Sequence, residues 1–423
     1  MRLSEAAGRP RDLLATLREP ATIRARCAAV TRSVAEGRSG YFQLDLGRLD
    51  ETARRVEGVI RRRFPELRIP YHSRWRHFEA GGVDRKAELD ALMAGRDTAA
   101  QARAQFDLTV VSVLLDAGAG PSWRYLEPGP GGAAYARSEG LGVATFRAFL
   151  AGSFSARPED PLRCDAAALE RLDAGALRAV FQASPSNPLV GLEGRVGLMN
   201  RLGAALREQA ARDGLEARPG LLFDRVSARG SRAGVSATEL LLEVLQVLGP
   251  VWRSGSVVKG IAAGDVWPHR WAGADIGNGK RDPTTGEWVP FHKLSQWLTY
   301  SLLEPLQWAG MAVTGLDALT GLPEYRNGGL LLDSGVIVPR HGSDLARTWK
   351  PSDEFVIEWR ALTVTLLDQL AERIRQRLGL AADQMPLACI LEGGTWAAGR
   401  EIAAELRAGG GPPFQIDSDG TVF

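Results

Sequence analysis

The sequence predicts a mainly α-helical protein, with a large helical domain and few short strands. Apolar residues recur every three or four positions over long stretches, whereas the strict alternation that marks a half-buried strand is sparse. The chain has 423 residues, and 45% of them are hydrophobic. That composition is sufficient for a large buried core, either in one big domain or in two lobes.

The first part of the chain contains two predicted helices, at about 21–36 and 49–63. We interpret residues 1–95 as a helical N-terminal lobe, because both helices fall within them. Residues 96–423 would then form the main helical catalytic domain.

Three more helices are expected after residue 95, at about 99–115, 138–150 and 187–211. Ser138 is the expected N-cap of the second, since a serine hydroxyl can accept a hydrogen bond from a backbone N–H of the first turn. The backbone amides at that helix start are also a potential anion site, although ordinary capping explains the same residues.

Two further helices have clear end signals in the sequence. One begins at Ser236, where Ser236 and Glu239 have the spacing of a capping box, and Gly249-Pro250 ends it. The other covers about 353–378, and Gly379 follows it as a helix terminator.

Charge and cysteine content exclude several classes of protein. A net charge of +2 provides no strong field toward nucleic acid or anionic lipid, so we expect neither as a partner. The three cysteines are widely spaced and odd in number, which argues against a disulfide framework and fits a reducing cytoplasm. The N-terminus lacks a signal-type apolar run, and the most apolar stretch, 108–115, is too short to span a bilayer.

The segment 290–305 is expected to be an amphipathic helix with a polar face. Proline suits the first helical position, so we place the helix start at Pro290, and Pro305 should end or kink it. The spacing of three and four residues puts Lys293, Gln296 and Tyr300 on one face, opposite the apolar stripe Phe291, Leu294, Leu298 and Leu302. This face is either exposed to solvent or part of the wall of a site, and Trp297 beside it favours the wall.

The segment 319–329 is the second candidate for chemistry. Glu324 and Arg326 are either a surface ion pair or, with Glu324 in a pocket, a general base or an anion that faces developing positive charge. Gly328-Gly329 would permit close backbone approach. A short hairpin is expected directly after them, over 330–338.

Other motifs indicate no metal and no nucleotide triphosphate. Asp116 and Trp123 bracket a glycine-containing loop, but the dinucleotide and Walker patterns are absent. His72 and His77 are five residues apart, so they do not share a helix face as metal-ligating pairs usually do, and there is no Cys-His cluster. No nucleophile-elbow pattern occurs, although a Ser-His-Asp triad stays open.

Several strings together resemble the uracil-catabolism four family. They lie at 187–195, 289–303, 319–329, 358–363, 391–400 and 418–423. The resemblance covers nearly the whole chain from about residue 40. It implies a role in a pyrimidine-degradation route that starts from uracil and passes through a ribosylated intermediate.

The same motif order is similar, more distantly, to the queuosine-salvage nucleosidases. The matching residues are Phe291, Lys293 and Gln296, then Pro188, Leu189, Val190 and Arg195, then Glu358 and Arg360. Glu324-Tyr325-Arg326 stands where that family has Asp-Tyr-Arg, so the carboxylate lies about one methylene further out. This resemblance implies a mostly helical fold like that of DNA glycosylases and cleavage of an N-glycosidic bond of a 5′-phosphorylated nucleoside.

These observations lead to the hypothesis of an N-ribosyl hydrolase that acts on a ribosylurea-type or 5′-phosphorylated nucleoside intermediate. Glu324 would stabilise positive charge on the sugar and take a proton from water, and Lys293 and Arg326 would orient it or hold phosphate oxygens. The expected substrate-binding residues are Gln296, Tyr300, Tyr325, Asp116, Trp123, Arg137, Ser138, Arg195, Trp267 and Trp396.

Two alternatives stay open at this point. One is an amidohydrolase of a ring-opened ureido intermediate, although most such enzymes use a metal or a Ser or Cys nucleophile. The other is a non-catalytic partner that binds a nucleotide and supports another pathway enzyme. In each case we expect a small ribosylated ligand, no cofactor, and a monomer or small homo-oligomer.

Overall fold

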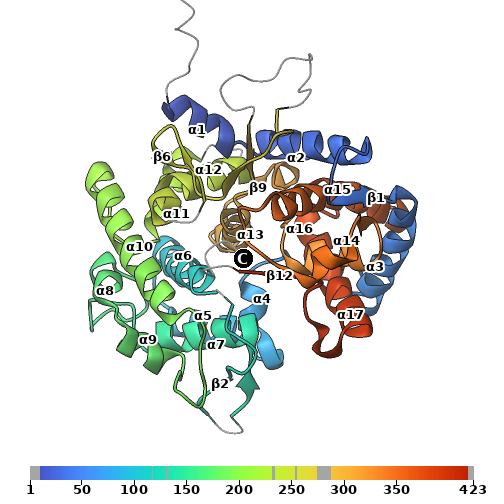
Figure 1. The fold of residues 1–423 in the computed structure, drawn as a ribbon. Coiled ribbons are helices and arrows are strands. Elements are labelled where there is room, and N and C mark those ends of the chain that lie inside the picture. Colours follow the sequence, from blue (N-terminus) through green and yellow to red (C-terminus); the bar gives the residue numbers. More distant parts are fainter. Residues whose placement is uncertain are drawn as a thin grey trace, which may run out of the picture.

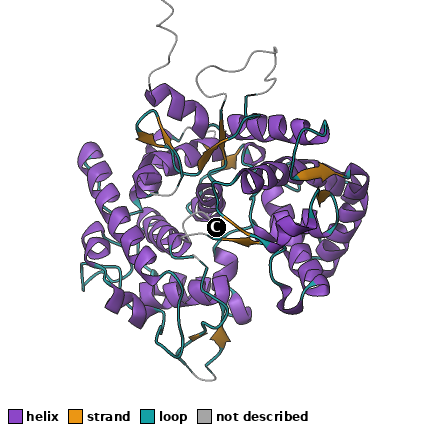
Figure 2. Ribbon diagram, viewed as in Figure 1, coloured by secondary structure: helices purple, strands orange, loops and turns teal. Residues whose placement is uncertain are grey.

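Helices make up most of the computed structural model, and the strands in its described part are only two or three residues long (Figures 1 and 2). The structure describes residues 10–116, 118–129, 132–230, 234–252, 255–273 and 287–417. The mainly α prediction is therefore confirmed. In this part of the chain, no helix combines the length and the apolar composition needed to cross a membrane.

The helices occur along the whole described chain. The longer ones are α2 (Pro20–Ala35), α3 (Leu49–Arg63), α6 (Thr98–Leu114), α7 (Arg137–Leu150), α10 (Leu192–Asp213), α12 (Ala237–Leu248), α13 (Lys293–Trp308) and α15 (Glu354–Leu378). The shorter ones are α1 (Pro10–Arg18), α4 (Trp75–Phe78), α5 (Arg85–Leu92), α8 (Ala166–Arg171), α9 (Ala174–Val180), α11 (Leu221–Arg229), α14 (Tyr325–Asp333), α16 (Leu387–Ile390) and α17 (Trp396–Leu406).

The two helices with clear end signals form as the sequence predicts. The Ser236 hydroxyl accepts the Glu239 N–H at 3.1 Å, and the Ser236 N–H donates to the Glu239 carboxylate at 3.0 Å, so the capping box of α12 is confirmed. Gly379 ends α15 with a φ of 70°, a conformation that glycine adopts without steric penalty.

Two other helix starts differ from the prediction. Ala136 is the N-cap of α7, so Ser138 lies inside the first turn and does not cap the helix. The helix expected from residue 187 begins at Leu192, because Gly191 precedes it with a left-handed φ of 72° that a right-handed helix cannot contain.

Helix α13 also begins and ends differently. Pro290 belongs to strand β8 (Trp288–Pro290), which pairs with β7 (Val266–Pro268), and the helix starts only at Lys293. The helix continues through Pro305 because the carbonyl that this proline cannot bond finds another donor: the indole N–H of Trp75 donates to the Ser301 oxygen at 3.1 Å.

The hairpin expected over 330–338 is wrong. The first part of this segment continues helix α14 to Asp333. The last part forms β10 (Ile337–Pro339), which pairs antiparallel with β1 (Phe42–Leu44). The partner strand is about 300 residues away in sequence, so no local pattern could identify it.

Helix α13 lies near the centre of the ribbon, and it contacts α6 and α12 (Figure 1). On the right of the view, the N-terminal helices α2 and α3 pack against α15, and α14 packs against α15 and α17. Residues before 95 thus share the core with the C-terminal helices, and the division at residue 95 stays a prediction.

Close packing of α14 against α15 depends on a single glycine. A Cβ at Gly328 would lie 2.3 Å from the ring of Trp359, whereas one at Gly329 would meet its nearest neighbour, Pro413, at 3.5 Å. We expect Gly328→Ala to destabilise the protein by about 1–3 kcal/mol, because the indole must move. Gly329→Ala is the matched control, with an expected change from neutral to about 1 kcal/mol stabilising. Urea unfolding measures both, and equal effects would contradict this account.

Candidate functional site

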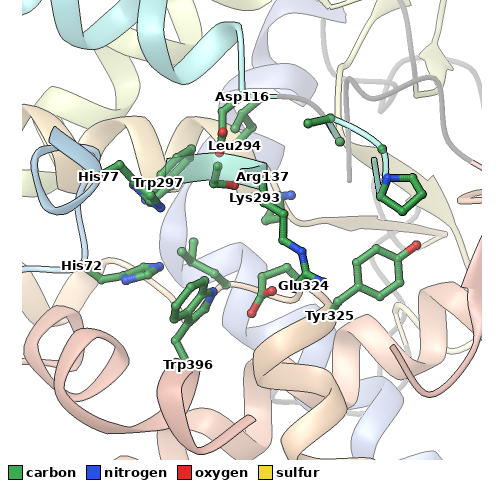
Figure 3. Close-up of a pocket in the computed structure, with 16 residues that line it drawn as sticks. His72, His77, Asp116, Arg137, Lys293, Leu294, Trp297, Glu324, Tyr325 and Trp396 are labelled. Atoms are coloured by element: carbon green, nitrogen blue, oxygen red, sulfur yellow. The ribbon is translucent and has the colours of Figure 1, made fainter. Parts of the chain in front are cut away.

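A cavity of about 490 Å³ opens between the helices (Figure 3). Its walls come from segments that are far apart in the sequence. The lining residues are His72, His77, Asp116, Gly118, Ala119, Gly120, Pro121, Arg137, Ser138, Lys293, Leu294, Trp297, Leu322, Glu324, Tyr325 and Trp396.

Three helices direct their N-termini at this cavity, since α7, α13 and α14 each contribute first-turn or N-cap residues to its wall. A helix N-terminus carries roughly half a positive charge, and its first backbone N–H groups have no intrahelical acceptor. The cavity is therefore suited to an anionic ligand or to an anionic side chain.

The start of α13 is held by a buried ion pair. Both oxygens of Asp265 accept hydrogen bonds from Arg360 at 2.7 Å, and one of them also accepts the Lys293 backbone N–H at 3.0 Å. Trp267 adds an indole N–H at 2.7 Å. Burial raises the pKa of Asp265, but Arg360 and the other donors outweigh it and bring the pKa to about 2. This carboxylate fixes where the Lys293 side chain enters the cavity.

Lys293 and Glu324 line the same cavity and carry opposite charges. Burial lowers the pKa of Lys293, and the negative charge of Glu324 opposes that shift. Figure 3 shows Tyr325 beside Glu324 in the cavity wall.

Glu324 is the N-cap of α14. One carboxylate oxygen accepts the Arg326 N–H and the other accepts the Asn327 N–H, both at 2.7 Å. Asn327 is itself held by the Leu322 carbonyl at 3.2 Å and by the Thr395 hydroxyl at 2.8 Å. Since a carboxylate has about four lone-pair sites, this half-buried acid keeps accepting capacity for a ligand or a water.

The start of α7 forms another part of the wall. Arg137 has a φ of 53°, a left-handed conformation that is costly for a residue with a side chain. The N-cap, Ala136, has no side chain that can satisfy the first-turn amides. Arg137 and Ser138 thus present a guanidinium, a hydroxyl and a helix N-terminus to the same space.

Asp116 lies beside the start of α7, because the same Arg74 nitrogen contacts its carboxylate and donates to the Ser138 carbonyl at 3.2 Å. Its carboxylate is 3.0 Å from the Arg74 guanidinium, which is completely buried. Arg195 donates to the carbonyls of Leu115 at 3.0 Å and Gly118 at 3.4 Å, on either side of Asp116. Arg195 therefore acts on the cavity through the loop that carries Asp116.

Aromatic rings and imidazoles close the remaining side. His77 stands edge-on to Trp297 with ring centroids 5.8 Å apart, and His72 lies 6.1 Å from Trp396. Within the described residues, His77 Nδ1 and the Trp297 indole N–H have no hydrogen-bond partner. Both are buried atoms of side chains that line the cavity.

Seven of the residues singled out from the sequence line this cavity together. They are Glu324, Lys293, Tyr325, Asp116, Arg137, Ser138 and Trp396. Burial raises the pKa of Tyr325 to about 12, so its phenol keeps its proton at neutral pH. Their roles toward a substrate stay predictions.

The other six lie outside the cavity wall. Arg326 donates to the Gly410 carbonyl at 3.1 Å, and Trp123 is buried with its indole N–H bonded to the Phe181 carbonyl at 2.9 Å. Gln296 and Tyr300 lie on the face of α13 that the sequence predicted for the site. Both are completely buried and contact the backbone of Thr320. Arg195 and Trp267 support the loops described above.

The lining residues His72, His77, Leu294 and Leu322 are not among those that the sequence predicts for a site. Leu294 was expected in the apolar stripe, but it is only half-buried and faces the cavity. In the sequence, the two histidines stand out only as a possible metal-binding pair. Their signal was weak, because short turns around α4, and not a helical repeat, bring them to one wall.

One group in the described part of the chain has the composition of a metal site: His269, Glu354 and Glu358. His269 Nε2 is 3.6 Å from Glu358 and 3.7 Å from Glu354. However, His269 Nδ1 accepts the Trp271 N–H at 3.2 Å, so a neutral ring carries its proton on Nε2 and offers no lone pair there. Arg270 also occupies both oxygens of Glu354 at 2.6 Å. The Nε2 atom and the two carboxylates lie too far apart for a hydrogen bond, and the ring offers no lone pair to a metal ion in this arrangement.

Comparisons with known proteins place the chain in a family. The family described as "Protein of unknown function (DUF1688)" matches residues 16–423. The chain is 39% identical over 390 residues to "Protein urg3" of Schizosaccharomyces pombe, covering 90% of this chain and 92% of that protein. It is 36% identical over 415 residues to "Uracil catabolism protein 4" of Lachancea kluyveri, covering 92% and 93%. The resemblance to the uracil-catabolism four family is thereby confirmed, and the protein belongs to the DUF1688 family.

Proposed function

We propose that this protein acts in uracil catabolism as an N-ribosyl hydrolase that cleaves a ribosylurea-type intermediate, with or without a 5′-phosphate, into urea and a ribose product. The name of the Lachancea kluyveri relative, "Uracil catabolism protein 4", supports the pathway. The observation that carries the reaction is the Glu324 carboxylate, held by two backbone N–H groups and opening into an enclosed cavity beside Lys293.

Cleavage of an N-ribosyl bond builds positive charge on the sugar carbon. A fixed carboxylate next to that carbon stabilises the charge, and it can take a proton from the attacking water. Because helix hydrogen bonds hold Glu324, it needs no reorganisation when the charge develops. Lys293 would then bind sugar or phosphate oxygens and keep the carboxylate in place.

The start of α7 is the proposed site for a 5′-phosphate. Arg137, the Ser138 hydroxyl and the free helix start together match a phosphate group. We expect Arg137→Ala to weaken binding of the phosphorylated ligand by about tenfold or more, since a hydrogen bond to a charged group contributes roughly 1.5–3 kcal/mol. Unphosphorylated ribosylurea should change by less than about threefold. Calorimetry measures both affinities. Arg178→Ala, which changes an exposed arginine, is the control. Equal losses of affinity for the two ligands would contradict the assignment of the phosphate site.

The state of the three cysteines argues against the alternative of an amidohydrolase with a thiol nucleophile. Cys27, Cys164 and Cys389 are all buried, and burial raises the pKa of each thiol, that of Cys389 to about 12. A buried thiol that keeps its proton is a poor nucleophile.

The direct test is product analysis with the purified protein. Ribosylurea and its 5′-phosphate are incubated separately, and NMR quantifies urea, free ammonia and the ribose product. A glycosidase releases urea and ribose in equal amounts without ammonia. Ammonia with an intact N-ribosyl bond would instead establish the amidohydrolase, and tight binding without turnover would establish the non-catalytic partner.

A further inference from the structure

A buried histidine–carboxylate pair lies in the cavity wall away from Glu324. The His72 imidazole is 7% exposed, and its Nδ1 is 2.9 Å from an oxygen of Glu392. Burial raises the pKa of Glu392, but the hydrogen bond to His72 and the charge of Arg63 outweigh it and bring the pKa to about 2. The carboxylate is thus an anion at neutral pH, and Nδ1 carries the proton that it accepts.

The second ring nitrogen of His72 is the one open to the cavity. His72 lines the cavity, and within the described residues Nε2 makes no hydrogen bond. The backbone also fixes the ring, since the His72 N–H donates to the Ala388 carbonyl at 3.0 Å. In Figure 3, His72 and Glu324 lie on either side of Trp396. A ligand that spans the cavity would therefore meet an anion at one end and an imidazole at the other.

The backbone around Glu392 forms an uncommon type of helical turn, which helps to orient Glu392 toward His72. Glu392 belongs to a π-helical segment (Leu391–Thr395) between α16 and α17, and such turns occur frequently at functional sites. A Cβ at Gly394 would lie 2.5 Å from Val56, so this turn presses directly on α3. That packing fixes the direction in which Glu392 points.

From this geometry we infer that His72 is the general acid that protonates the leaving nitrogen, and that Glu392 is its positioning residue. The inference rests on the proposed function. Urea is a poor leaving group as an anion, so breaking the bond between the sugar carbon and nitrogen requires a proton at that nitrogen. His72 Nε2 supplies it, while Glu324 takes one proton from the water that forms the new carbon–oxygen bond.

The proton count closes over one turnover. Water provides the hydroxyl of the ribose product and a proton to Glu324, and the leaving nitrogen receives a proton from His72. Transfer from Glu324 through solvent restores His72, so no other reactant is consumed. His77, the neighbouring imidazole, stays neutral, because burial and the nearby Arg74 lower its pKa to about 3. It can only accept or donate a hydrogen bond to the leaving group.

The decisive experiment compares two leaving groups. Ribosylurea needs protonation, whereas 4-nitrophenyl β-D-ribofuranoside releases a stable anion and needs none. We expect His72→Gln to lower kcat for ribosylurea by roughly 10²–10⁴-fold and to keep the nitrophenyl riboside within about threefold. Glu324→Gln should lose both activities. The exposed His341→Gln is the matched control and should lose neither.

A second readout is the pH profile of kcat for ribosylurea. An acid acts only in its protonated form, so wild-type activity should fall on the alkaline side, and His72→Gln should lack that limb. Glu392→Gln should lower kcat for ribosylurea and keep the nitrophenyl riboside within about threefold, because the carboxylate that fixes the His72 ring is gone. Glu405→Gln, an exposed acid on α17, should change neither rate. The ionisable groups around the ring are Glu392, Arg63, Arg74, His77, Glu304 and Cys389.

Each possible result decides the matter. Equal losses of His72→Gln on both substrates, or an alkaline limb that survives in this variant, would overturn the acid role. If the folded wild-type protein cleaves neither substrate, the proposed function falls, and the inference falls with it. Circular dichroism and thermal melting establish that every variant is folded before rates are compared.

Discussion

Glu324→Gln is expected to reduce the turnover of ribosylurea by roughly 10²–10⁴-fold. Glutamine keeps the size of the side chain and one accepting oxygen for the start of α14, but it has no negative charge. It can neither take a proton from water nor stabilise an electron-poor sugar carbon. Initial rates of urea release at saturating substrate measure the effect, and wild-type turnover in this variant would remove Glu324 from the mechanism.

A control is needed because Glu324 is also a helix cap. Loss of a capping carboxylate typically costs about 0.5–2 kcal/mol, so a small drop in melting temperature is expected and does not explain a large loss of rate. Glu193 is the matched control, an exposed acid in the first turn of α10. Glu193→Gln also removes an acidic charge near a helix N-terminus, and it should leave turnover unchanged.

Asp265→Ala is expected to cost about 3–5 kcal/mol of unfolding free energy, because it removes the carboxylate from a completely buried Arg360. The same change removes the acceptor for the Lys293 N–H, so the start of α13 should loosen. Urea unfolding at pH 7 measures the loss. The matched control is Arg270→Ala, which breaks an equally bidentate but exposed pair with Glu354 and should cost less than about 1 kcal/mol.

The stability difference between wild type and Asp265→Ala should also depend on pH. The folded pKa of Asp265 is about 2, below the ordinary value of 3.8, so the native state favours the anion. Its contribution is fully present above the ordinary value, and it is lost as the pH falls through about 2. The difference should therefore be constant above about pH 5 and narrow between pH 4 and 2. An unchanged difference at pH 3 would contradict the assigned role of this ion pair.

Local pattern was enough to locate most of the helices. The capping box at Ser236 and the glycine at 379 act within one turn of the chain, and both form as expected. Pro305 does not end its helix, because Trp75, over 200 residues away in the sequence, donates to the carbonyl that the proline leaves without its helical partner. The hairpin expected at 330–338 failed for the same reason, since the strand that pairs with β10 lies near the N-terminus.

The candidate site divides in the same way. Motif order predicted the family and pointed to Glu324 and Lys293, the capping signal at Ser138 pointed to the start of α7, and apolar periodicity predicted a mainly helical chain. Which face of α13 reaches the cavity was decided only by tertiary packing, which buries Tyr300 and turns Trp297 toward the cavity. His72 and Glu392 meet for that reason too. The residue type determines what chemistry a side chain can perform. Its neighbours depend on contacts between segments hundreds of residues apart, and a linear pattern does not encode those contacts.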